Sequence, residues 1–145
     1  MEIEKEKIYL EAPKKLKATD IKTLPYPGFP TDLQQIFGTL MCTAKGSSVL
    51  VENIFENRFK YISELTKMGA KAKIEGKTAI INGVRKLYGA NVTSTYLRGG
   101  AALILAGLVA KGRTTVTNIE YILRGYEKLD EKLNALGANI KLVKT

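Results

Sequence analysis

The stretch Ala44–Ile54, AKGSSVLVENI, returns in shortened form as Ala110–Ile119, AKGRTTVTNI. Each copy contains a run rich in β-branched residues, which is typical of a β-strand. Apolar residues at intervals of three and four flank both runs and predict helices there. We therefore predict one strand–helix–strand–helix–strand unit twice, over about residues 18–83 and 84–145. Strands that alternate with helices place the chain in the α/β (α+β) class.

The first helix of each unit is predicted from its apolar face. In the first unit the face consists of Leu33, Ile36, Phe37, Leu40, Met41 and Ala44. Thr31 is the expected N-cap, and Gln34 three residues later would complete a capping box. In the second unit, residues 99–110 are apolar on nearly every side, so we expect this helix to be buried at the centre of the fold.

A second, plainer helix is predicted in each unit. Its apolar stripe consists of Phe59, Ile62 and Leu65 in the first unit, and of Tyr126, Leu129, Leu133 and Leu136 in the second. Gly69 and Gly137 fit the left-handed position that closes a helix. Further strands are expected near residues 7–11, 71–74, 78–82 and 139–143, with residues 75–77 as a turn.

The composition excludes several kinds of chemistry. The chain of 145 residues has no histidine and one cysteine, Cys42. A Ser-His-Asp triad, a Cys-His pair and a His- or Cys-rich metal site are therefore excluded, and we assign neither a metal site nor a cofactor. No apolar run is long enough to span a bilayer, and the charged start lacks a signal-peptide core, so we expect a cytoplasmic protein without a membrane partner.

The charge balance suggests an anionic partner. The net charge is +9, from 23 basic and 14 acidic residues. Such a balance fits either nucleic acid or a phosphorylated small molecule. The lysines are scattered, apart from Lys14, Lys15 and Lys17, and scattered lysines usually mark a solvated face. A basic nucleic-acid-binding module is an alternative, but nucleic acid is not the expected partner because no binding motif accompanies the charge.

Three arginines lie at the starts of predicted helices: Arg98 before the buried helix, and Arg58 and Arg124 before the second helices. A cation at a helix N-terminus is disfavoured by about 0.3–1 kcal/mol. Their placement therefore indicates an arriving phosphate or carboxylate. The alternative is that each arginine pairs with a nearby acid such as Glu56 or Glu120. Recurrence at equivalent places in the repeat favours the anion.

Asp32 allows two interpretations. It lies in the first turn of its predicted helix, where the helix dipole stabilises a carboxylate, so a capping role is sufficient. It could equally be a base or hydrogen-bond acceptor for a substrate hydroxyl at the edge of a cleft. The proline-rich segment 25–30 restricts the backbone before it and holds the helix start in place. The residues alone leave both interpretations open.

Four motifs occur in a distinctive order: Phe29-Pro30-Thr31-Asp32, Phe55-Glu56-Asn57-Arg58-Phe59, Leu97-Arg98 and Arg124-Gly125-Tyr126-Glu127. In this order and at these separations, the chain resembles the C-terminal part of the UDP-N-acetylglucosamine enolpyruvyl transferases (1-carboxyvinyltransferases) of the EPSP synthase-like superfamily. The resemblance covers about residues 18–143. It implies part of an inside-out α/β barrel, with two of the three repeated units of one domain. The shikimate-pathway enolpyruvyl transferases share the unit and are the alternative within the superfamily.

The resemblance also implies a reaction and a set of site residues. The family transfers the enolpyruvyl group of phosphoenolpyruvate to the 3′-hydroxyl of UDP-N-acetylglucosamine in peptidoglycan synthesis. Asp32 would stand at that hydroxyl as a general base, and Arg98 and Arg124 would engage phosphoenolpyruvate. Arg58 would line the cleft, and the backbone at Ile54 would lie near the sugar nucleotide.

Two departures from the family qualify this expectation. Tyr96 stands where the family usually has an aspartate, and tyrosine supplies no carboxylate at neutral pH. The chain is also far shorter than the family's proteins. We therefore expect a fragment that is catalytically incomplete without the remainder of the enzyme. Open strand edges would also favour self-association.

Overall fold

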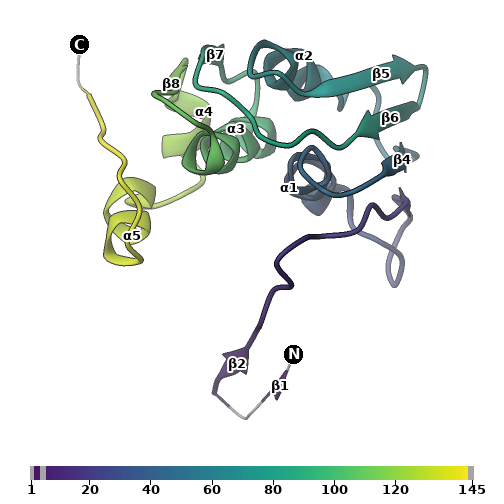
Figure 1. The fold of residues 1–145 in the computed structure, drawn as a ribbon, viewed down its shortest axis with the longest axis horizontal. Helices are drawn as coiled ribbons and strands as arrows, with labels where there is room; N and C mark the ends of the chain where they lie inside the picture. Colours follow the sequence, from purple (N-terminus) through teal and green to yellow (C-terminus); the bar gives the residue numbers. More distant parts are fainter. Residues whose placement is uncertain (1, 4–5, 144–145) are drawn as a thin grey trace.

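The computed structural model describes residues 2–3 and 6–143 of the chain. Figure 1 shows a body of helices beside a twisted sheet, with an N-terminal arm and a C-terminal helix that stand away from it. The four-stranded sheet has the order β3 (Ile21–Lys22), β4 (Ser47–Val51), β6 (Thr78–Asn82) and β5 (Lys71–Glu75). No helix in the described part is long and apolar enough to cross a bilayer.

The first unit follows its predicted order closely. Helix α1 (Thr31–Met41) joins β3 to β4, which pair in parallel, and α2 (Lys60–Lys67) joins β4 to the antiparallel hairpin β5–β6. The hairpin turns at Gly76, as the sequence predicts. Alternate residues of β4 and β6, such as Leu50 and Ile81, are fully buried because one face of the sheet packs against the helices.

The second unit begins in the same way and ends differently. Strands β7 (Asn91–Thr93) and β8 (Thr115–Thr117) pair in parallel across α3 (Leu97–Val109). Instead of one second helix there are two short ones, α4 (Glu120–Leu123) and α5 (Leu129–Ala135).

The prediction of a closing strand at residues 139–143 is wrong. These residues are irregular and pair with no other strand in the described part. Ile140 instead bonds the Asn134 side chain, which donates to its carbonyl at 2.8 Å and accepts from its amide at 3.1 Å. The local turn thus takes up the hydrogen bonds that a strand partner would have taken.

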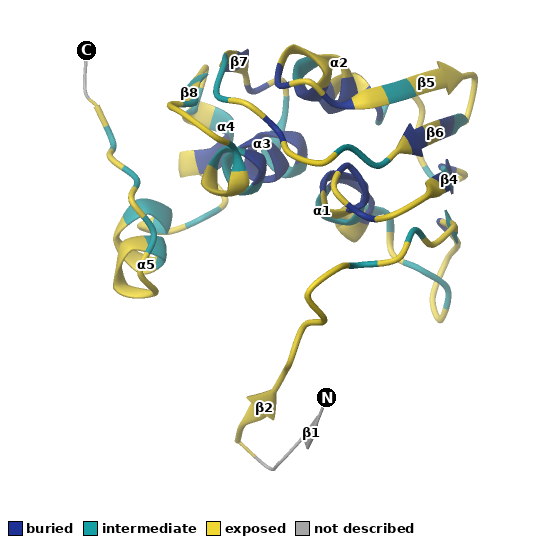
Figure 2. Ribbon diagram, in the orientation of Figure 1, coloured by how far each residue is buried: buried dark blue, intermediate teal, exposed yellow. Residues whose placement is uncertain are grey.

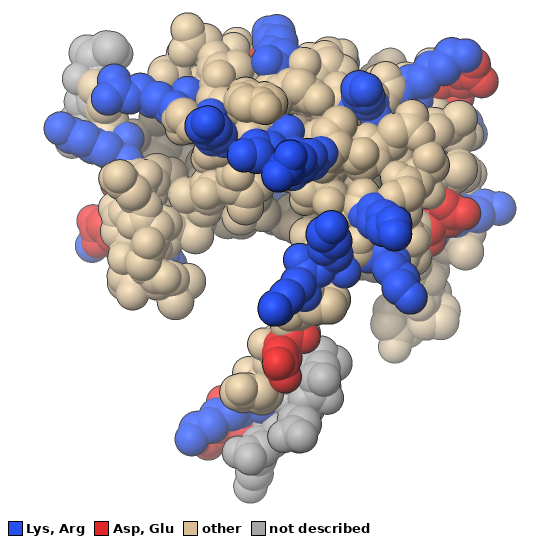
Figure 3. All heavy atoms as spheres, in the orientation of Figure 1, with Lys and Arg blue, Asp and Glu red and all other residues tan. Residues whose placement is uncertain are grey.

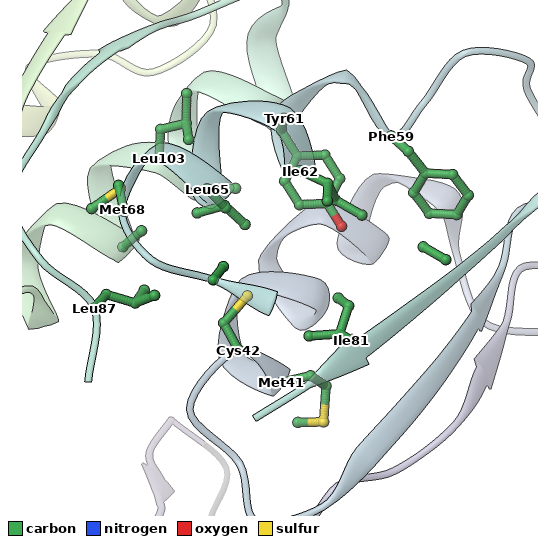
Figure 4. Close-up of a cluster of buried hydrophobic side chains, with 14 of the residues drawn as sticks. Met41, Cys42, Phe59, Tyr61, Ile62, Leu65, Met68, Ile81, Leu87 and Leu103 are labelled. Carbon is green, nitrogen blue, oxygen red and sulfur yellow. The ribbon is translucent and has the colours of Figure 1, made fainter. Parts of the chain in front are cut away.

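The core lies between α1, α2, α3 and the sheet (Figure 4). Met41, Tyr61, Leu65, Ile81 and Leu103 bring their side chains together there, and each is at most 3% exposed. Figure 2 shows the buried residues concentrated in these elements. The predicted stripe of α2 is buried as expected, because Phe59, Ile62 and Leu65 all lie in this core.

The predicted apolar face of α1 is wrong in part. Leu33 and Leu40 are 48% and 45% exposed, and only Met41 and Ala44 of the stripe are buried. The rest of the buried face of the helix consists of Gln34, Gln35, Gly38 and Thr39.

Burial of α3 is confirmed for most of its length. Its small residues Gly99, Gly100 and Ala102 are buried, which allows neighbouring elements to approach closely. The end of the helix departs from the prediction, because Leu108 is 37% and Val109 is 65% exposed.

Helix α5 and the arm lie outside the core. No residue of α5 is buried. Of its predicted stripe, Tyr126, Leu129 and Leu133 are half-buried, and Leu136 at its end is 85% exposed. The expected opening strand appears only as β2 (Ile8–Tyr9), which pairs with β1 (Glu2–Ile3) in the arm. Gly69 and Gly137 have φ of 89° and 92°, which confirms the left-handed helix ends.

Candidate functional site

A cleft opens where the first turns of α1 and α3 meet the loop before α2. It has a volume of about 440 Å³. Its lining consists of Asp32, Glu56, Asn57, Arg58, Lys60, Thr95, Tyr96, Leu97, Arg98 and Arg124. Four of the five predicted site residues, from four separate segments of the chain, therefore share one cleft.

Asp32 lies between two of the predicted arginines. Its Oδ1 is 3.4 Å from Arg58 Nη2, and its Oδ2 is 3.0 Å from Arg98 Nη2. The Asp32 side chain is 50% exposed, so both pairs are open to solvent and a competing anion can reach the arginines. The alternative that each arginine pairs with a nearby acid therefore holds for Arg58 and Arg98, with Asp32 in place of Glu56 or Glu120.

The predicted capping box is wrong. The N-cap of α1 is Pro30, and no side chain caps the helix. Thr31 Oγ1 and Gln34 Nε2 instead donate to Glu52 Oε2, at 2.9 and 3.4 Å. A carboxylate from β4's end, far away in sequence, outcompetes the local arrangement because a charged acceptor makes the stronger hydrogen bonds.

Glu52 is the structural residue that sequence reasoning missed. It is 2% exposed, and its Oε1 accepts from Thr23 Oγ1 at 2.9 Å, from the Ile54 amide at 2.9 Å and from the Phe55 amide at 3.2 Å. Together with Thr31 and Gln34, these donors tie the start of α1 to the loop after β4. An acidic residue directly after an apolar strand was the available signal.

Tyr96 lines the cleft and contacts Arg58 through both its hydroxyl and its ring. Its hydroxyl donates to the Arg58 carbonyl at 2.6 Å, and the Arg58 guanidinium lies 5.7 Å from its ring centroid and 4.6 Å from that of Phe55. Burial raises the pKa of Tyr96, so the phenol stays neutral and keeps its proton for this bond. Gly99 makes the room, because a Cβ there would lie 2.8 Å from the ring.

Arg98 is held on two sides at the start of α3. Its Nη1 donates to the Tyr126 hydroxyl at 2.8 Å, and its Nη2 donates to Asp32. The hydrogen bonds to Tyr126 and Asp32 raise the pKa of Arg98, so the guanidinium remains charged. Helix α3 has no side-chain cap, which leaves its N-terminal amides able to face an anion.

Arg124 corrects the idea of three arginines at three helix starts. It is the C-cap of α4, and α5 begins only at Leu129. Its guanidinium lies 5.0 Å from the Tyr121 ring centroid, and it forms no ion pair among the described residues. It thus adds an unpaired positive charge to the cleft, though without a helix dipole beside it.

Ile54 lies outside the cleft lining. Its neighbours Phe55 and Glu56 line an adjoining cavity of about 420 Å³ that shares Asn57, Arg58 and Lys60 with the cleft. The Ile54 amide donates to Glu52, so its backbone is fixed at the rim. The described residues contain no group of three or more His, Cys, Asp or Glu side chains that could hold a metal ion.

Known proteins with similar sequences are enolpyruvyl transferases. The chain is 56% identical over 137 residues to UDP-N-acetylglucosamine 1-carboxyvinyltransferase 1 of Caldanaerobacter subterraneus subsp. tengcongensis, covering 94% of this chain and 33% of that protein. It is 53% identical to UDP-N-acetylglucosamine 1-carboxyvinyltransferase of Desulfofundulus thermocisternus, covering 94% of this chain and 56% of that protein. The chain thus spans about a third to a half of the length of these relatives.

Solved structures with a similar fold include an enolpyruvyl transferase and an EPSP synthase. The enolpyruvyl transferase NikO of Streptomyces tendae superposes with a TM-score of 0.82 at 30% identity, covering 89% of this chain and 30% of that one. EPSP synthase of Acinetobacter baumannii superposes with a TM-score of 0.65 at 21% identity, covering 92% of this chain and 30% of that one, and shares the fold. Residues 1–133 match the family model of EPSP synthase (3-phosphoshikimate 1-carboxyvinyltransferase). The chain therefore belongs to this family of enolpyruvyl transferases.

Proposed function

We propose that this chain forms one wall of the active site of an enzyme that transfers enolpyruvyl from phosphoenolpyruvate to the 3′-hydroxyl of UDP-N-acetylglucosamine in peptidoglycan synthesis. The placement of Asp32 between Arg58 and Arg98, with Arg124 in the same cleft, carries the proposal. A base for a hydroxyl and cations for a phosphorylated carboxylate are what this transfer requires. The names of the relatives at 53–56% identity support this choice of substrates.

The carboxylate and the arginines of the cleft would have different roles in the reaction. Asp32 would accept the proton of the sugar hydroxyl once an incoming anion has taken its place at the arginines. Arg98 and Arg124 would bind phosphoenolpyruvate and stabilise the charge that develops as phosphate leaves. Arg58, stacked between Phe55 and Tyr96, would hold the nucleotide-sugar side of the cleft. The remaining groups would come from the rest of the enzyme, and we place the reaction in the cytoplasm.

NMR titration of the labelled chain tests this proposal. UDP-N-acetylglucosamine and phosphoenolpyruvate at millimolar concentration should shift the amides of Asp32, Arg98 and Arg124. Arg98→Ala should abolish the phosphoenolpyruvate shifts, while the control Arg113→Ala, outside the cleft, should retain them. Unshifted cleft amides with both ligands would overturn the proposal.

The shikimate-pathway reaction is the second candidate, because the matched family carries that name. Shikimate 3-phosphate would then shift the cleft amides and UDP-N-acetylglucosamine would not. The same titration separates the two, since both reactions use phosphoenolpyruvate and differ only in the acceptor.

A further inference from the structure

Basic residues that are scattered in the sequence gather in the fold, because four segments run side by side. The Lys45 amide donates to the Leu16 carbonyl at 2.8 Å, which joins the first segment to the second. The Gly83 amide donates to the Gly46 carbonyl at 2.9 Å, and the Lys111 amide donates to the Leu87 carbonyl at 2.9 Å. The segments around residues 17, 45, 83–89 and 111–113 therefore lie in that order across one face.

Six basic side chains stand on these segments, and we name them the basic band: Lys17, Lys45, Arg85, Lys86, Lys111 and Arg113. All six are exposed, and none forms an ion pair within residues 6–143. The sequence has no acidic residue between Asp32 and Glu52, or between Glu75 and Glu120, to balance them. In the view of Figure 3, basic side chains run across this body with few acidic ones among them.

The basic band is separate from the cleft. Lys45 and Lys111 follow the C-terminal ends of α1 and α3, whose first turns carry Asp32 and Arg98. Helices of 11 and 13 residues are about 16 and about 20 Å long, so the helices hold the two sites apart.

Helix dipoles do not account for the whole basic band. A lysine after a helix C-terminus is stabilised by the dipole, which explains Lys45 and Lys111. Lys17, Arg85 and Lys86 follow no helix, and the chain holds six like charges on adjacent segments against their mutual repulsion. A ligand that neutralises them would relieve that repulsion.

The form of the basic band matches a linear polyanion. Adjacent segments paired by backbone hydrogen bonds lie about 5 Å apart, so the cations form a row. The helix ends next to this row are the C-terminal ends of α1 and α3, which do not select a compact anion. Tyr88 lies on segment 83–89, in the middle of the basic band, and is 54% exposed. An unpaired base can stack on its ring.

We propose that the basic band binds the phosphate backbone of a single-stranded nucleic acid, independently of base sequence. Loops build the basic band, so no helix is presented to the groove of a duplex. Sequence alone disfavoured this partner because no binding motif accompanies the charge. The basic residues are scattered along the chain, and only the fold makes them neighbours.

Fluorescence anisotropy of a labelled oligothymidine of about 20 nucleotides tests the proposal on the full chain. Six phosphate contacts predict that log K falls with log salt with a slope of about −4 between about 50 and about 200 mM salt. The double variant Lys45→Glu, Lys111→Glu should weaken binding at least tenfold at low salt. Tyr88→Ala should weaken it severalfold and leave the slope unchanged.

A control separates the basic band from net charge. Lys73→Glu with Lys132→Glu changes the charge equally on β5 and α5, away from the four segments, and should retain most of the affinity. If the control weakens binding as much as the band variant, or if the chain ignores the oligonucleotide at low salt, the proposal is wrong. Binding to vesicles of equal parts phosphatidylcholine and phosphatidylglycerol without oligonucleotide binding would also overturn it. The milder pair Lys17→Gln, Lys86→Gln serves if the charge-reversed variant fails to fold.

Discussion

Replacing Glu52 by alanine should destabilise the chain more than any replacement in the exposed cleft. The change removes the acceptor of five donors, among them the backbone amides of Ile54 and Phe55. A buried donor left without a partner costs about 1–3 kcal/mol, and two of the five contacts are long and weak. We expect Glu52→Ala to lower the free energy of unfolding by about 3–5 kcal/mol, near the upper limit for one substitution.

Glu52→Gln should cost much less, about 1–2 kcal/mol. One oxygen keeps the position that receives Thr23 and the two amides. The new amide group faces Gln34, whose Oε1 has no partner in the described part and can turn to accept from it. Neighbouring Glu56 is exposed, so Glu56→Ala is the matched control, with an expected change below about 0.5 kcal/mol.

Urea unfolding followed by circular dichroism measures all three variants. A Glu52→Ala variant that unfolds within about 1 kcal/mol of the wild type would contradict this role of Glu52, as would a glutamine variant as unstable as the alanine one.

Three further predictions concern the core and the walls of the cleft. Tyr96→Phe leaves the Arg58 carbonyl without its donor and should cost about 1–2 kcal/mol in urea unfolding, whereas Tyr9→Phe in the exposed arm should have no effect. Burial raises the pKa of Cys42 from 9.0 to about 12, so the folded thiol keeps a proton that the unfolded one loses. The unfolding free energy should therefore fall as pH rises above 9.0, by up to about 1.4 kcal/mol per pH unit, and a flatter profile in Cys42→Ala would show that this thiol is responsible. Gly83→Ala would drive a Cβ into the Ala44 carbonyl and should destabilise by at least about 1–3 kcal/mol; an equal loss in Lys86→Ala, exposed on the same segment, would contradict this explanation.

Local pattern was sufficient for most of the fold. Apolar spacing identified α1, α2 and α3, and the left-handed glycines ended α2 and α5 where expected, because these signals act within a few residues. The hairpin β5–β6 followed from its turn. Apolar spacing did not show that the second unit has two short helices, α4 and α5, where one was predicted. Buried Ile122 holds α4 in place, and Lys128 in a left-handed conformation separates it from α5.

The sequence suggested four residues that share the cleft, but not their hydrogen-bond partners, and the fifth, Ile54, lies outside the cleft lining. Motif order identified Asp32, Arg58, Arg98 and Arg124, and the fold brings all four to one cleft. Their partners depend on contacts between distant segments, which no local rule gives. Glu52 was missed for the same reason, since its importance comes from donors that reach it only after the sheet and α1 have packed together.

Glu52 also shows how two copies of one plan come to differ. The Thr23 amide donates to the Val51 carbonyl and the Ser94 amide to the Thr117 carbonyl, so Val51 and Thr117 are equivalent positions in the two units. The side chains of Asn53 and Asn118 also correspond, because they donate to the Thr23 and Ser94 carbonyls, and Glu52 is therefore an extra residue of the first unit. A helix starts two residues after Asn118, whereas the chain continues as a loop after Asn53, where the Ile54 and Phe55 amides donate to Glu52. The two units thus diverge where the first has one residue more than the second. The first unit continues into the loop that carries Arg58 and the second into a helix that ends at Arg124, so the two units contribute unlike segments to the cleft.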